Sequence, residues 1–324
     1  MMLRRPKVAI IGGGNVGTAC AHQIALKELA DITVIDIPER IDHVQGIVLE
    51  ITECAPIDGF DVDLRVSSDY RTIEESDVVI ITAGYPRHPG MTRDDLIEQN
   101  YKIIVSASER ISEYAPGSIV IVVTNPLDAM AYAVWQVTGF SRKRVLGHSG
   151  CLDTSRYRTF ISKELGISAE DVHALIIGSH GDEMVPLKRY TTVHGIPVSE
   201  LLPAEKVESC IRRAKQAGTE IVKLKGVSAF YTPGSSITEM VESMLKDKRR
   251  ILPCSVYCEK EYRVGGYFIG VPCIIGSNGV EKIIELELDG NELEALNASV
   301  NHVKSLVEIV EQLSSHEHSL PVNR

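Results

Sequence analysis

The feature that most constrains the fold is a glycine-rich turn directly after a short apolar run. Lys7–Ile11 is apolar and rich in β-branched residues, which predicts a buried strand. It is followed by Gly12-Gly13-Gly14-Asn15-Val16-Gly17, a GxGxxG motif. The first glycine permits a tight turn, the second lets backbone approach a pyrophosphate, and the third lets the next helix pack closely on the strand. With helical spacing from Asn15 to about Leu29, the segment is typical of a dinucleotide-binding site.

A carboxylate at the end of the next apolar run supports this interpretation. The strand predicted at Ile32–Asp36 ends in an aspartate about 20 residues after Gly17. At that spacing Asp36 accepts hydrogen bonds from the adenosine ribose hydroxyls and repels a 2′-phosphate. The first arginine after it is Arg40. The sequence therefore predicts NAD rather than NADP.

Further apolar runs predict a parallel sheet in the N-terminal half. Val78–Thr82 and Ile119–Thr124 are continuous and apolar, and a long helical stretch separates them from about Thr92 to Tyr114. Strands without polar alternation are covered on both faces, which is typical of a doubly wound α/β fold of the Rossmann type. The pattern changes after Gly150, so we expect a dinucleotide-binding domain over residues 1–150 and an α+β catalytic domain over residues 151–324.

The second half mixes helices and strands. We expect helices at Leu152–Leu165, Glu205–Lys225 and Glu292–Leu313, and strands at Val172–Ile177, Ile251–Glu259, Tyr267–Ile275 and Ile283–Leu288. The tail Ser314–Arg324 is polar, and we expect it to be frayed.

Charge, hydropathy and cysteine pattern narrow the class of protein. The net charge of −10 argues against a nucleic-acid binder, and no apolar run reaches the roughly 18–20 residues that span a membrane. The start lacks the features of a signal peptide, which favours the cytoplasm or a compartment reached by a presequence that has been removed. The seven cysteines are scattered, and the pair Cys254 and Cys258 has no matching ligand pair nearby. We therefore expect no disulfide framework and no metal site, and buried thiols in that strand.

Four polar segments carry candidate chemistry. They are the loop Thr82–Arg93, the strand end Thr124-Asn125-Pro126, the helical segment Leu152–Arg156 and the segment Gly178–Asp182. Ligands collect at the carboxyl ends of strands in open α/β sheets. Residues three apart share a helix face, so Asp153 and Arg156 can point together into one cleft.

Taken in order, the segments GGGNVG, TAGYPRHPGMTRDDL, VVTNP, LDTSR and GSHGDEMVPL resemble the lactate/malate dehydrogenase family over nearly the whole chain. The resemblance implies NAD-dependent oxidation of a 2-hydroxy acid, with His180 as the catalytic acid/base and Asp153 orienting its imidazole. Arg156 would bind the substrate's C1 carboxylate, Arg93 would polarise its carbonyl oxygen on loop closure, and Asn125 would hydrogen-bond it. A free histidine has a pKa near 6.5, so both protonation states are accessible near neutrality.

Arg87 bears on the choice of substrate. In the family, the position that it matches faces the substituent at C3, with arginine in members that use malate and an uncharged residue in those that use lactate. The resemblance thus implies malate and oxaloacetate. Lactate dehydrogenase activity and a non-catalytic NAD-binding protein remain the alternatives. The small residues Ser228 and Ala229 are both candidates for contact with the substrate.

The remaining expectations concern the cofactor and the assembly. We assign Asn100, Val123, Thr124 and Asn125 to the cofactor site, in addition to the glycine-rich turn and Asp36. The resemblance also implies a homo-oligomer, with a tetramer ahead of a dimer.

Overall fold

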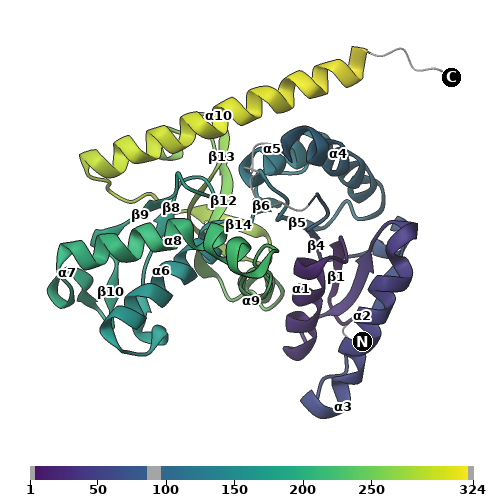
Figure 1. Cartoon of the computed structure of the whole chain (residues 1–324). Coiled ribbons are helices and arrows are strands. Elements are labelled where there is room, and N and C mark those ends of the chain that lie inside the picture. The colour runs from purple at the N-terminus through teal and green to yellow at the C-terminus, as the bar shows by residue number, and fades with distance from the viewer. Residues whose placement is uncertain (1–3, 86–95, 320–324) are drawn as a thin grey trace.

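A computed structural model describes residues 4–85 and 96–319 and is organised around a nine-stranded sheet (Figure 1). Strands β3-β2-β1-β4-β5-β6 are parallel in that order, and β12, β13 and β14 continue the sheet beyond β6 as antiparallel strands. The bounds are β1 Lys7–Ile11, β2 Asp31–Ile35, β3 Leu64–Ser67, β4 Val78–Ile81, β5 Ile119–Val122, β6 Val145–Gly147, β12 Arg250–Cys258, β13 Tyr267–Gly276 and β14 Gly279–Ile283. The predicted α/β class with a parallel N-terminal sheet is confirmed.

Helices cover both faces of the parallel strands, which explains their unbroken apolar sequences. Every residue of β4 and β5 is buried. Figure 1 shows α4, α5 and α10 together along one side of the molecule, and α1 packs against α9. The helices of this half are α1 Asn15–Leu26, α2 Ile41–Glu53, α3 Ala55–Asp58, α4 Ile97–Tyr114 and α5 Leu127–Thr138.

The C-terminal half packs α6 against α8, α9 and β12. Its helices are α6 Gly150–Leu165, α7 Val198–Leu201, α8 Ala204–Lys225, α9 Tyr231–Leu245 and α10 Gly290–Ser319. Its short strands are β7 Val172–His173, β8 Ile176–Ile177, β9 Val185–Pro186, β10 Thr192–Val193 and β11 Ile196–Pro197.

Two predicted strands are wrong in their extent. The run Val172–Ile177 divides into β7, which pairs with β10, and β8, which pairs with β9, because the chain changes partners between them. The strand predicted at Ile283–Leu288 ends where it was expected to begin, since β14 closes at Ile283. Beyond it, the Tyr262 hydroxyl donates to the Ile284 carbonyl and accepts from the Leu286 N–H, which occupies backbone groups that a strand would pair.

The helix ends also differ from expectation. The first helix stops at Leu26, three residues early. The closing helix continues through Ser319, so the predicted fraying is wrong for residues 314–319, while residues 320–324 lie outside the described residues. No glycine or proline interrupts the sequence between Gly290 and Pro321, which leaves nothing to end the helix sooner.

Candidate functional site

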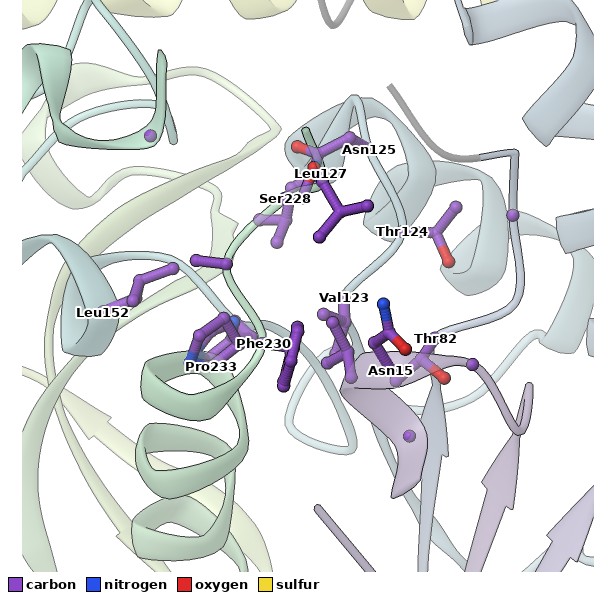
Figure 2. A pocket seen from close by; sticks show the side chains of 18 of the residues that line it. Asn15, Thr82, Val123, Thr124, Asn125, Leu127, Leu152, Ser228, Phe230 and Pro233 are labelled. Atoms are coloured by element: carbon purple, nitrogen blue, oxygen red, sulfur yellow. The ribbon is translucent and has the colours of Figure 1, made fainter. Parts of the chain in front are cut away.

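A cavity of 470 Å³ lies where β1, β4 and β5 end (Figure 2). Its floor is formed by residues that follow these strands, including Asn15, Thr82 and Thr124. Leu152 and Pro233, from the C-terminal half, face them across the cavity in Figure 2. The chain order of the sheet reverses between β1 and β4, and ligands bind outside the carboxyl ends of strands at such a switch point.

The glycine-rich turn has the space and the backbone shape for a pyrophosphate. Gly12 has φ +107°, and a Cβ there would lie 2.6 Å from the Ala83 nitrogen. A Cβ on Gly17 would collide with the Gly12 carbonyl oxygen. At Gly14, by contrast, a Cβ would meet nothing within 4 Å, and no side chain caps the N-terminus of α1. The free N–H groups of this helix end can therefore bind a phosphate.

Asp36 lies beside this turn rather than in the cavity wall. Its Oδ2 accepts from the Gly13 N–H at 2.8 Å, and its Oδ1 accepts from the Ile37 N–H at 2.8 Å. The Arg40 Nε lies 3.4 Å from the same carboxylate, which is 11% exposed. Asp36 and Arg40 therefore lie together at one end of the glycine-rich turn.

This pairing gives a prediction for cofactor choice. In an Asp36→Ser variant we expect the NADH KM to rise and NADPH oxidation to appear, because the negative charge is lost and Arg40 is released to pair with a 2′-phosphate. Parallel rates with the two cofactors measure the switch. An additional Arg40→Ser change should remove the gained NADPH activity. If Asp36→Ser leaves both rates unaltered, Asp36 does not select the cofactor.

Asn100 ties the loops at the cavity floor to one another. Its Nδ2 donates to the Asn125 carbonyl at 2.6 Å, and its Oδ1 accepts from the Tyr85 N–H at 2.8 Å. The Thr124 hydroxyl donates to the Ala83 carbonyl at 2.6 Å, and Val123 and Thr124 both line the cavity. The side-chain oxygen of Asn125 is buried and accepts no hydrogen bond from the described residues. Within the described part of the chain it is an unpaired acceptor on the cavity wall.

Asp153 connects a histidine and an arginine at the cavity wall. Its Oδ2 lies 2.8 Å from the His180 Nδ1, and its Oδ1 lies 3.4 Å from the Arg156 Nη1. The three side chains are 3%, 7% and 11% exposed for Asp153, His180 and Arg156 respectively. A carboxylate only accepts, so Nδ1 carries the proton and Nε2 presents a lone pair. His180 and Arg156 line the cavity, with Asp153 behind them.

The backbone that carries His180 is fixed by three other elements. The Gly178 N–H donates to the Gly270 carbonyl, and the Ser179 N–H donates to the Ser299 hydroxyl at 2.7 Å. The His180 N–H donates to Oδ2 of Asp128 at 3.0 Å. These contacts hold the imidazole at its position from β13, α10 and α5.

Sequence reasoning missed Asp128. This carboxylate lies in the first turn of α5 and is 4% exposed, and its Oδ1 accepts from the Ser255 hydroxyl. Burial raises its pKa, while the hydrogen bonds from Ser255 and the His180 N–H act in the opposite direction. In the sequence it is an acidic residue near a helix start, which is common without any role at a site.

His148 was also given no role, yet it lines the cavity and is 2% exposed. Its Nε2 lies 2.7 Å from the Ser236 hydroxyl. Burial, with a smaller contribution from His180, lowers the pKa of His148 to about 3. This histidine is therefore neutral in the folded protein at neutral pH.

The neutral His148 makes stability depend on pH. Below a pH of about 6.5, His148 is protonated in the unfolded chain but stays neutral in the folded chain. The free energy of unfolding therefore decreases as the pH is lowered from about 6.5 to about 3. The slope from this group is about 1.4 kcal/mol per pH unit. When the pH is lowered from 6.5 to 5, we expect the free energy of unfolding, measured with urea, to decrease by about 2 kcal/mol less in a His148→Asn variant than in the parent. Equal losses in both proteins would contradict this assignment.

The remaining wall comes from the α8–α9 connection. Gly226, Phe230 and both Ser228 and Ala229 line the cavity, so the choice between the last two stays open. The Lys225 ammonium lies 3.2 Å from the centroid of the Phe230 ring, which holds that ring by a cation–π contact. Gly218 and Val222 of α8 join them.

Two predicted substrate residues, Arg87 and Arg93, lie outside the described residues. Cys254 and Cys258 are buried in β12, as expected from the sequence. Among the described residues, every helix is too short or too polar to cross a bilayer.

Comparison with known proteins identifies the family. A family model for the lactate/malate dehydrogenase NAD binding domain matches residues 6–147, and a model for the lactate/malate dehydrogenase alpha/beta C-terminal domain matches residues 151–314. A malate dehydrogenase of Rhodopirellula baltica is 47% identical over 96% of this chain and 99% of its own. One of Bacillus subtilis is 48% identical over 94% and 98%.

Solved structures agree with the sequence comparisons. The apo malate dehydrogenase of Picrophilus torridus superposes with a TM-score of 0.92 at 44% identity, covering 97% of this chain and 99% of its own. A lactate dehydrogenase of Cryptosporidium parvum, solved with lactic acid and NAD, has a TM-score of 0.92 at 38% identity, over 96% and 99%. The chain belongs to the lactate/malate dehydrogenase family of NAD-dependent oxidoreductases.

Proposed function

We propose that this protein interconverts (S)-malate and oxaloacetate with NAD. The observation that carries the proposal is the buried Asp153 between His180 and Arg156 at the cavity wall. Relatives that are 47% and 48% identical are malate dehydrogenases, which supports the same substrate here. The two domains are taken as residues 1–150 and 151–324.

His180 acts as the acid/base of the reaction. Its Nε2 accepts the proton of the malate hydroxyl as C2 is oxidised, and it returns that proton to the carbonyl oxygen in the reverse direction. Asp153 stabilises the imidazolium that forms, because its carboxylate lies 2.8 Å from Nδ1 in a buried setting. The glycine-rich turn and Asp36 would hold NAD, which when bound would supply the nicotinamide that exchanges the hydride with C2.

The arginines orient the substrate. Arg156 offers its guanidinium to the C1 carboxylate, a geometry suited to a bidentate pair. The buried side-chain oxygen of Asn125, which has no partner among the described residues, accepts a hydrogen bond from the substrate or from the cofactor. Arg93 stabilises the charge that develops on the substrate oxygen, and Arg87 pairs with the C4 carboxylate; both roles rest on the family resemblance.

Initial rates of NADH oxidation test the proposal. Oxaloacetate, pyruvate and 2-oxobutyrate are offered in parallel, with NADPH as the control cofactor. We expect a strong preference for oxaloacetate with NADH. A preference for pyruvate would be consistent with the proposed role of His180 but would contradict the assignment of oxaloacetate as the substrate. Folded protein that binds NADH but turns over none of the three would be a binding protein rather than an enzyme.

We infer that the chain works as a homo-oligomer in the cytoplasm, and we favour a tetramer over a dimer. Large apolar side chains that are exposed on the single chain support association: Leu49 at 60%, Leu224 at 79% and Tyr231 at 73%. Seven free cysteines are compatible with a reducing compartment. Light scattering on the purified protein measures the assembly, and a mass of 35.6 kDa would contradict it.

A further inference from the structure

Three side chains with metal-binding atoms meet away from the cavity, between α1 and the α2–α3 corner. His22 lies on α1, Cys54 lies at the junction of α2 and α3, and Asp58 ends α3. One ligand atom of each residue lies within 4.8 Å of the others. None of the three lines the cavity of the proposed active site. The cluster is therefore a separate feature of the molecule.

The histidine of this cluster has an unused ring nitrogen. Nε2 of His22 is buried, and no hydrogen-bond partner for it is found in the part of the chain that the structure describes. Buried polar atoms are nearly always satisfied, because leaving one unpaired costs free energy. A cation bound by one nitrogen of His22, the Cys54 thiolate and the Asp58 carboxylate would give this imidazole a partner.

The donor types select the class of cation. A thiolate, an imidazole and a single carboxylate suit Zn²⁺, whereas Mg²⁺ and Ca²⁺ require mainly oxygen ligands. Zinc bond lengths of about 2.0–2.3 Å put tetrahedral ligand atoms roughly 3.3–3.8 Å apart. Rotation of the exposed Asp58 side chain and the half-buried Cys54 side chain can close the observed spacing. A water molecule can complete the tetrahedron on the exposed side.

We propose that His22, Cys54 and Asp58 form a Zn²⁺ site that ties α1 to α2 and α3. On binding, the Cys54 thiol releases its proton to solvent and the thiolate coordinates the ion. Cys54 and Asp58 lie four residues apart on consecutive helical turns, so they chelate from one side while His22 binds from the other helix. The ion would stabilise the folded chain, because the three residues are brought together only in the fold.

The position of the cluster explains why the sequence did not indicate it. The expectation of no metal site rested on the absence of paired ligand spacings, and His22 is 32 residues from Cys54 in the chain. Only the packing of α1 against α2 brings them together. Each residue alone is an ordinary helix residue.

Cobalt and zinc titrations of the reduced, chelator-treated full chain test the site. Co²⁺ should give a thiolate-to-metal absorption band. One equivalent of Zn²⁺ should displace the Co²⁺, abolish the band and raise the Tm of the protein. Excess Mg²⁺ should not displace the Co²⁺. Cys54→Ser should remove the band, and His22→Gln should weaken Zn²⁺ binding by about tenfold or more, since even indirect partners of a metal are worth 10–100-fold. Oxaloacetate turnover should persist in both variants, because neither residue lies at the cavity.

Matched controls separate this site from adventitious binding. His43 is an exposed histidine on α2, and His43→Gln should bind Zn²⁺ as the parent does. The sequence also has a histidine pair at His316 and His318, so a His316→Gln/His318→Gln variant tests that segment. The other cysteines are all buried, which leaves Cys54 as the accessible thiolate. Zinc binding that survives Cys54→Ser and His22→Gln, or no zinc binding by the parent, would overturn the proposal.

Discussion

Replacing His180 by asparagine is expected to lower kcat for oxaloacetate reduction by about 10²–10⁴-fold, the usual contribution of a positioned acid/base. The variant loses the nitrogen that exchanges the substrate proton. The fold should persist, because the contacts that fix this segment involve the backbone of residues 178–180. Asp153 also retains Arg156 as a cationic neighbour. Steady-state rates measure the loss.

Two comparisons make this result specific to proton transfer. NADH binding, followed by the fluorescence of the bound cofactor, should remain close to that of the parent, since His180 is not part of the glycine-rich turn. Asp153→Asn should also lower kcat, because the amide cannot stabilise the imidazolium as a carboxylate does. A His180→Asn variant that keeps the parent kcat while remaining pure and folded would remove this residue from the mechanism.

The parallel sheet was predictable because its signals are local. Continuous apolar runs such as Val78–Thr82 and Ile119–Thr124, when they alternate with helices, indicate the buried strands of a parallel sheet. The glycine-rich turn is similarly local, and the structure gives the physical reason for Gly12 and Gly17, where any Cβ would strike the backbone. The strand at Ile283–Leu288 failed because Tyr262, more than 20 residues away, pairs with its backbone.

The site was predictable only in part. Contacts between residues that are close in the sequence could be expected, whereas contacts between distant residues could not. Asp153 and Arg156 share a helix turn, so their common direction could be expected. Their meeting with His180 came from the family resemblance rather than from spacing. Asp128 and His148 have no sequence signal, because their importance lies in burial and in contacts with Ser255 and Ser236. The α8 wall was missed for the same reason, since small and apolar helix residues are ordinarily core.

The described cavity leaves one charge of the proposed substrate without a partner. Oxaloacetate carries two carboxylates at neutral pH, and Arg156 is the only arginine or lysine among the described residues that line the cavity. A buried carboxylate without a cation or hydrogen-bond donors is costly. The sequence contains Arg87 and Arg93 outside the described residues, and we propose that one of them supplies the second cation. The resemblance assigns the C4 carboxylate to Arg87.

An Arg87→Gln variant is accordingly expected to reverse the substrate preference. Its kcat/KM for oxaloacetate should fall and that for pyruvate should rise, changing their ratio by about 10⁴-fold, because sites built for a polar group reject an analogue that lacks it by 10⁴–10⁵. With glutamine, the methyl group of pyruvate no longer leaves a desolvated guanidinium unpaired. The measurement is kcat/KM for oxaloacetate, pyruvate and 2-oxobutyrate with NADH.

The matched control is Arg110→Gln, which removes an exposed arginine of α4 that pairs with Glu113 and does not line the cavity. It should leave the substrate ratio unchanged, which shows that the loss of one positive charge elsewhere is not sufficient. A gain with 2-oxobutyrate alongside pyruvate would indicate that the pocket accepts any uncharged substituent at C3. If Arg87→Gln instead lowers both rates equally, Arg87 acts on binding in general, and the second carboxylate must be paired by another residue such as Arg93.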